Sequence, residues 1–193
     1  MTTQQWISFI ILLIFILWII FKPKKIKGIQ DFRITHINAD DVISRVFKDQ
    51  EVSRVKELFE EYAFKFTQDG CFSLNPSTEH VVTIVKNVFG QEKFMEVMST
   101  LDNYGQERYE AGRNRVQLSI IKASDGDSDK IKGLVSRAKH DFRDIVSLAE
   151  TPLIFEALAS GNYDLGSILS AEHLPERDQE LRQYVAWLLR YTH

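Results

Sequence analysis

A run of sixteen positions near the start of the chain, Trp6–Phe21, is apolar except for Ser8 and carries no charge. A helix of this length spans about 24 Å, somewhat less than a hydrocarbon core of about 30 Å. Trp6 and Trp18 lie near its two ends, where amphipathic rings favour the membrane interface, and Phe21 is its last residue. The pattern predicts a single transmembrane helix over 6–21.

The residues on either side of this run favour an anchor that is retained over a signal peptide that is removed. The five preceding residues contain no basic side chain, and the run passes directly into Lys22, Lys24, Lys25 and Lys27 without a small-residue cleavage site. By the positive-inside rule these lysines place residues 1–5 outside and residues 22–193 in the cytoplasm, at a bacterial inner membrane. A cleaved signal with a periplasmic domain is the alternative.

After a basic juxtamembrane linker over 22–37, apolar residues recur mostly at helical spacing. The stripe from Val52 to Phe66 predicts one amphipathic helix, and the stripe from Ile131 to Ala149 predicts another. Asn38, Asn75 and Asp127 are predicted N-caps, and Gly90 is expected to separate two helices. Further helices are expected over 115–122, 152–159 and 176–191. The sequence predicts an all-α fold, in which the transmembrane helix precedes an irregular multi-helix bundle over 38–193.

The charge of the chain is unevenly distributed. All 27 acidic residues follow residue 30, together with 20 of the 24 basic ones, so the body carries a net charge of about −7. An acidic body argues against nucleic-acid binding, which needs a basic stripe. The single cysteine, Cys71, forms no intrachain disulfide and is interpreted as a half-buried structural thiol.

No motif for a nucleotide, zinc or calcium site stands out, and we expect no cofactor. His140 and Asp141 form a His-Asp dipeptide that, with His80 and Asp178, is distantly similar to the metal-binding pattern of HD-type phosphohydrolases. That chemistry requires the four side chains to converge on a divalent metal that activates water. The simpler interpretation is a pair of i,i+4 ion pairs on one helix, Arg137 with Asp141 and His140 with Asp144.

The stretch RVQLSIIKASDGDSDKIKGLVSRAKHDFRDIVSLAE, Arg115–Glu150, resembles a segment of short bacterial proteins of unknown function. Those proteins share an R-V-Q-L-x-I-L-K helix, a G-D turn and a helix ending in D-[YF]-R-D-V. The resemblance covers under a fifth of the chain. It implies a bacterial origin and no particular activity.

These observations favour a non-enzymatic interaction or scaffold module. The N-terminal helix is expected to hold the body at the lipid bilayer, where the body binds an unidentified membrane or cytoplasmic protein. The candidate contact residues are Asp141, Arg143, Asp144 and Trp187, and no catalytic or metal-ligating residue is assigned. A membrane-tethered, metal-dependent phosphohydrolase is the alternative.

Overall fold

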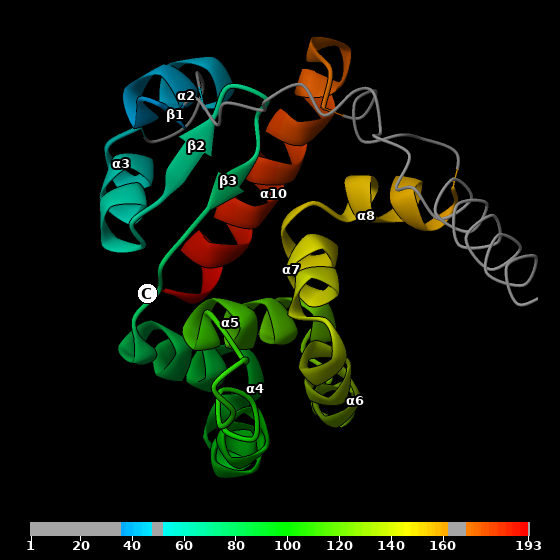
Figure 1. Cartoon of the computed structure of the whole chain (residues 1–193). Helices are drawn as coiled ribbons and strands as arrows, with labels where there is room; N and C mark the ends of the chain where they lie inside the picture. Colours follow the sequence, from blue (N-terminus) through cyan, green and yellow to red (C-terminus); the bar gives the residue numbers. More distant parts are fainter. Residues whose placement is uncertain (1–35, 48–51, 162–168, 193) are drawn as a thin grey trace, which may run out of the picture. The chain divides into compact units, whose positions relative to one another are not determined.

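Helices make up most of the computed structural model, which describes residues 36–47, 52–161 and 169–192 (Figure 1). In chain order the elements are β1 (His36–Ile37), α2 (Ala39–Val46), α3 (Val52–Glu61), β2 (Lys65–Thr67), β3 (Phe72–Ser73), α4 (Thr78–Leu101), α5 (Arg113–Ser124), α6 (Ser128–His140), α7 (Phe142–Glu150), α8 (Pro152–Ala159), the short 3-10 helix η1 (Ala171–His173) and α10 (Leu174–Tyr191). The predominantly helical class predicted from the sequence is confirmed for these residues.

Side-chain caps set several helix starts. Asn38 accepts the N–H of Asp40 at the start of α2, and Asp127 accepts the N–H of Asp129 at the start of α6, so both predicted caps are confirmed. The cap predicted at Asn75 is wrong. The N-cap of α4 lies two residues later, at Ser77, which forms a reciprocal capping box with His80.

Helices α4 and α5 occur where the sequence predicts helices, on both sides of Gly90 and around 115–122. Gly90 interrupts the α4 ribbon with φ 75° and ψ 168°, a conformation almost restricted to glycine, and so separates two helical segments as predicted. Helix α5 is buried on every side, including at Gln117 and Ser119. This burial explains why the hydrophobic pattern of α5 shows no clear period.

A small antiparallel sheet replaces the end of the helix predicted to continue to Phe66. Helix α3 stops at Glu61, Ala63 adopts a positive φ of 47°, and β2 then pairs with both β1 and β3 in the order β1-β2-β3. The stretch Tyr62–Phe66 has an apolar residue at every second position, which fits a strand as well as a helix. The end of the predicted linker, His36–Ile37, forms β1 and pairs with Thr67 and Phe66.

The long helix predicted through 131–149 is two helices. Asp141 has extended backbone angles, ends α6 and caps α7 by accepting the N–H of Arg143. A short polar residue that can cap a helix competes with the helical backbone, and here the cap prevails over the continuous apolar stripe.

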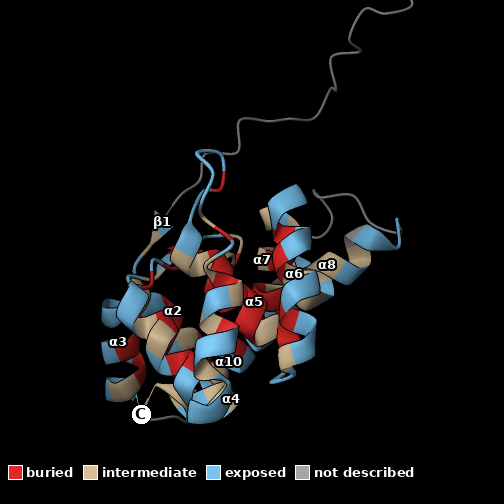
Figure 2. Ribbon diagram, turned by 90° about the horizontal axis from the view of Figure 1, so that it is seen from below, coloured by how far each residue is buried: buried red, intermediate tan, exposed pale blue. Residues whose placement is uncertain are grey.

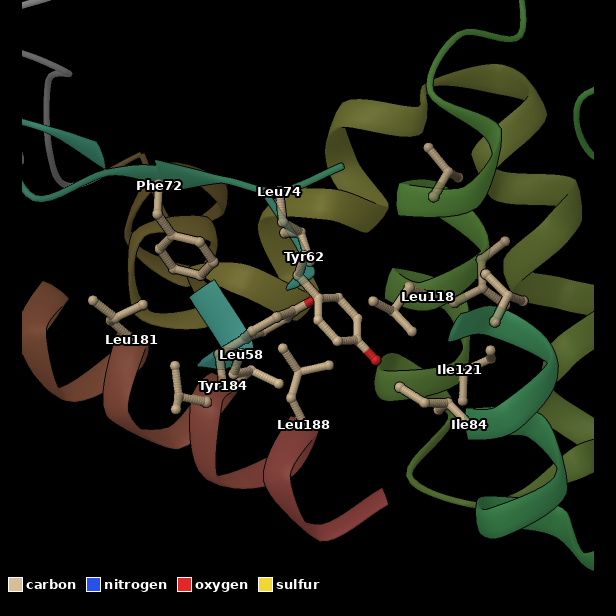
Figure 3. Close-up of a cluster of buried hydrophobic side chains, with 14 of the residues drawn as sticks. Leu58, Tyr62, Phe72, Leu74, Ile84, Leu118, Ile121, Leu181, Tyr184 and Leu188 are labelled. Carbon is tan, nitrogen blue, oxygen red and sulfur yellow. The ribbon is translucent and has the colours of Figure 1, made fainter. Parts of the chain in front are cut away.

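One part of the core lies between α10 and the pair α4 and α5 (Figure 3). Side chains from α3, β3, α4, α5 and α10 point toward one another there, among them Leu58, Phe72, Ile84, Leu118 and Tyr184. Helix α10 also contacts α2, α7 and α8, so it joins the sheet side of the body to the helices that follow. The N-terminal part of α10 and its neighbour α8 form the candidate site.

Candidate ligand-binding cleft

The residues assigned to the membrane anchor lie outside the part of the chain that the structure describes. They are Trp6, Trp18, Phe21, Lys22, Lys24, Lys25 and Lys27. Within residues 36–47, 52–161 and 169–192, no helix combines the length and apolar character needed to cross a membrane. The anchor therefore remains a prediction.

The predicted contact residues Asp141, Arg143 and Asp144 lie at the junction of α6 and α7. Arg143 donates two hydrogen bonds to the carboxylate of Asp141, at 2.8 and 2.7 Å, and these bonds lower the pKa of Asp141. Asp144 pairs with Arg137 at 3.4 Å. The predicted i,i+4 pairs are thus replaced by other pairings, because the helix breaks at Asp141.

Trp187, the fourth predicted contact residue, packs against the core. Its ring lies 5.9 Å from that of Tyr184 and 5.9 Å from that of Tyr191, and it is only partly exposed. This arrangement favours a packing role for Trp187.

The four residues of the metal hypothesis have separate partners. His80 pairs with Glu61 at 3.0 Å and stacks on Tyr62, His140 contacts the carbonyl oxygen of Ser136, and Asp178 holds Arg45 through two bonds of 2.9 Å. Among the described residues, no three His, Cys, Asp or Glu side chains gather in a way that could hold a metal ion. The convergence that a phosphohydrolase site requires is not met in this part of the chain.

A cleft of about 500 Å³ lies between α8 and the start of α10. Its described lining comes from Leu153, Ile154, Glu156, Ala157 and Ser160 on the α8 side and from His173, Glu176, Arg177 and Glu180 on the α10 side. This volume lies within the range typical of small-molecule sites, and an apolar wall with a few convergent polar groups is their usual lining. The cleft is larger than the other cavity described below, which has about 270 Å³.

Helix α8 supplies the apolar wall of the cleft. Its sequence, PLIFEALA, has one charged residue, yet none of its described side chains is fully buried and Leu153 is 48% exposed. Figure 2 shows α8 in the colours of intermediate and exposed residues. A helix with so few polar residues is normally buried in a core, so the partial exposure of α8 leaves apolar surface open in the described part of the body.

Glu180 forms the polar floor of the cleft. It is 2% exposed, and its Oε1 accepts the backbone N–H of Leu153 at 2.6 Å, which caps the start of α8 from a distant helix. Its second oxygen, Oε2, is buried and receives no hydrogen bond. Burial raises the pKa of Glu180 to about 7, although the amides of Leu153 and Ile154 and the positive charges of Arg177 and Lys122 act in the opposite direction.

A buried network of charges continues behind the cleft toward α5 and α7. Burial lowers the pKa of Lys122, although the negative charges of Glu150 and Glu180 act in the opposite direction. The ammonium group of Lys122 lies 5.5 Å from the ring centre of Tyr184. Glu150 is 3% exposed and is held by two hydrogen bonds from Arg115. Titratable groups therefore extend from Glu180 at the cleft, through Lys122, to the pair of Glu150 and Arg115 between α5 and α7.

A second cavity, of about 270 Å³, includes Asp141 and Arg143 in its lining. Its buried acid, Glu110, accepts the backbone N–H groups of Gly105, Gln106 and Glu107 at 2.7, 2.8 and 3.2 Å. Its other oxygen lies 3.6 Å from Lys139. These bonds fasten the loop between α4 and α5, so the polar groups of this cavity have a structural role.

Glu180 predicts a specific dependence of stability on pH. In the folded chain its pKa is about 7, against an ordinary value of 4.5. Its favourable contribution is therefore fully present below pH 4.5 and is lost as the pH rises through 7, by at most about 3 kcal/mol. We expect Glu180→Gln to reduce the fall in unfolding free energy between pH 5 and pH 8, as measured by urea denaturation.

Glu92→Gln is the matched control for this measurement, because Glu92 is an exposed acid on α4 outside the cleft. It is expected to retain the wild-type difference between the two pH values. A Glu180→Gln variant whose pH dependence equals that of the wild type would contradict the burial of this carboxyl group.

The sequence indicated part of this site. The short helix predicted over 152–159 is confirmed as α8, but the prediction did not include its place beside a cleft. Nothing in the local pattern linked Glu180 to the start of α8, which lies 27 residues away along the chain.

The chain matches no known protein family, no curated protein and no solved structure, so inference about its function starts from its own residues.

Proposed function

We propose that the chain is a membrane-anchored interaction module in a bacterium, with its helical body in the cytoplasm and its α8–α10 cleft as the recognition site for a partner protein. The helix predicted over 6–21 would hold the body at the inner membrane. The observation that carries the proposal is the apolar wall of α8, none of whose described side chains is fully buried. A partner that packs on this wall would remove apolar surface from water, which is the main driving force of protein association.

The cleft is a better candidate than the two surfaces named from the sequence. Trp187 already packs against Tyr184 and Tyr191, and Asp141 and Arg143 already satisfy each other. Exposed ion pairs of this kind contribute little binding energy, whereas apolar pockets near the centre of an interface contribute most of it. We therefore place recognition at α8 and α10.

Site-specific photocrosslinking in intact membranes tests the proposal. A benzophenone side chain at Leu153, inside the cleft, is expected to yield one reproducible crosslinked partner. The same group at Met95, which is 73% exposed on α4 outside the cleft lining, is expected not to yield it. Filling the cleft with Ala157→Trp is expected to abolish the product at Leu153.

Two outcomes would contradict the proposal. Equal crosslinking from Met95 and Leu153 would show non-specific proximity and not recognition by the cleft. Release of the chain from membranes by alkaline carbonate, or loss of about 2–3 kDa from its N-terminus, would refute the retained anchor, since signal peptides have about 15–30 residues.

A further inference from the structure

The start of α8 is held by a side chain from another helix. Oε1 of Glu180, on α10, accepts the backbone N–H of Leu153 at 2.6 Å and so satisfies one of the free donors of the first turn. Thr151, between α7 and α8, has non-helical backbone angles (φ −138°, ψ 60°) and separates the two helices. The contact between Glu180 and Leu153 therefore fastens α8 to α10 beyond this break.

The carboxyl group of Glu180 is shut off from solvent while this contact is in place. The residue is 2% exposed, and Oε2 is buried without a hydrogen bond. An ionised carboxylate here lacks water and uses only part of its hydrogen-bonding capacity, whereas the neutral acid avoids most of the cost of burying a charge. Loss of the proton from Glu180 therefore opposes the docking of α8.

The charged groups around Glu180 do not reverse this effect. Arg177, on the same helix, and Lys122, on α5, favour the ionised form, as do the two backbone amides at the start of α8. Burial acts more strongly and raises the pKa of Glu180 to about 7. In the described part of the chain, the other titratable side chains that line the cleft or interact with Glu180 or Lys122 are Glu156 on α8, His173 on η1, Glu176 on α10, Glu150 on α7, Asp125 after α5 and Cys71 between β2 and β3.

Helix α8 has few other contacts to hold it in place. It has eight residues, none of its described side chains is fully buried, and Leu153 is 48% exposed. Segments with few buried apolar side chains open locally at a lower free energy than the whole fold. When α8 separates from α10, water reaches Glu180 from the side of the cleft.

We propose that the protonation of Glu180 controls the docking of α8 on α10. With its proton, Glu180 stays buried and α8 is docked; without it, α8 separates and the carboxylate becomes hydrated. This device goes beyond the proposed function, because the release of α8 requires no partner. Since the transition ends close to neutral pH, a modest change in pH around the body changes how much apolar surface of α8 is free.

Hydrogen exchange of the full-length chain in detergent, followed by mass spectrometry of the peptides that contain α8 and α5, tests this device. Protection factors, which are corrected for the intrinsic effect of pH on exchange, are measured from pH 5 to pH 8. With a pKa of about 7 in the docked state and the ordinary 4.5 in the released state, linkage limits the fall for α8 to about 70-fold. We expect a fall of more than about tenfold, most of it below pH 7, with a plateau above pH 7.

Helix α5, which is buried on every side, reports on global unfolding. Because the release of α8 is local, we expect α8 at pH 8 to be at least about tenfold less protected than α5. Glu180→Gln keeps an acceptor for the N–H of Leu153 and cannot ionise, so its α8 is expected to be equally protected at pH 5 and pH 8. His173→Gln and Glu156→Gln, which remove other titratable groups from the cleft lining, are matched controls and are expected to retain the wild-type fall.

Three results would overturn the control of α8 by Glu180. They are equal protection of α8 at pH 5 and pH 8, a fall that persists in Glu180→Gln, and equal protection of α8 and α5 at pH 8, which would show that α8 opens only when the whole body unfolds. The wild-type profile alone decides the first and the third, so the test holds if Glu180→Gln perturbs folding. Absence of the crosslink from Leu153 refutes the interaction module and leaves this inference standing.

Discussion

Arg115→Met is expected to lower the free energy of unfolding by about 3–5 kcal/mol, because it leaves Glu150 charged and buried without its partner. In the folded chain the guanidinium of Arg115 donates to both oxygens of Glu150, at 2.8 and 2.6 Å. The side chain of Glu150 is 4% exposed, and its pKa is already raised by burial despite this pairing. Without Arg115, desolvation of the carboxylate is no longer compensated.

The loss is expected to grow with pH. A raised carboxyl pKa means that the folded state favours the neutral acid, so this stability is present at low pH and is lost as Glu150 ionises in the folded state. Denaturation of the full-length chain in detergent, followed by circular dichroism at pH 5 and pH 8, measures both effects. The Arg115→Met variant is expected to be closer to the wild type at pH 5.

The double variant Arg115→Met with Glu150→Met separates a lost partner from a lost contact. Replacing both members of a buried ion pair by apolar residues is often neutral, so we expect the double variant to recover most of the stability. If the double variant is as unstable as Arg115→Met alone, the loss comes from packing and not from the unpaired charge. Exposed Arg143→Met, which breaks a surface pair with Asp141, is the control and is expected to leave the stability close to that of the wild type.

This ion pair also joins the two ends of the stretch that resembles other short bacterial proteins. Arg115 begins the stretch and Glu150 ends it, and the two residues join α5 to α7. The intervening turn and α6 fold back so that the ends meet. The resemblance covered core and cap residues without indicating this pairing, since a contact over 35 positions leaves no local pattern.

Local signals predicted the parts of the fold that depend on nearest neighbours along the chain. Asn38 and Asp127 cap helices because a short polar side chain reaches the next backbone N–H groups whatever the tertiary context. Gly90 breaks α4 because other residues do not readily adopt its backbone angles. These features needed no knowledge of the rest of the body.

Features that depend on distant partners could not be predicted in this way. Phe66 belongs to β2 because β1 and β3 offer it hydrogen bonds, and its spacing from Val52 fits a helix equally well. The cleft depends on Glu180 reaching the start of α8 across the bundle. Asp141, assigned from the sequence to a helix interior, caps α7 in the structure, and the packing of α7 on α5 after this break left no sign in the local pattern.

Tyr184→Ala is expected to destabilise the chain by about 3–5 kcal/mol, whereas Tyr184→Phe is expected to be neutral or slightly stabilising. Tyr184 is fully buried at the centre of the core, and its ring lies 5.3 Å from that of Phe72 (Figure 3). Truncation to alanine leaves a cavity between α10, β3 and α5, and the loss of ring contacts adds to the loss of transfer energy.

The hydroxyl group of Tyr184 determines the second half of this prediction. This hydroxyl group is buried without a hydrogen bond. Burial raises the pKa of Tyr184 well above 10.0, so the group stays neutral, and no hydrogen bond offsets its loss of hydration. Phenylalanine keeps the ring and removes the unsatisfied group. Chemical denaturation of both variants measures the two changes in unfolding free energy. If Tyr184→Phe lowers the unfolding free energy by more than about 1 kcal/mol, the hydroxyl group stabilises the nearby charges of Glu150 and Arg115. The contrast between the two variants therefore tells whether the centre of this body is held by apolar packing alone or also by the polar network that extends to the cleft.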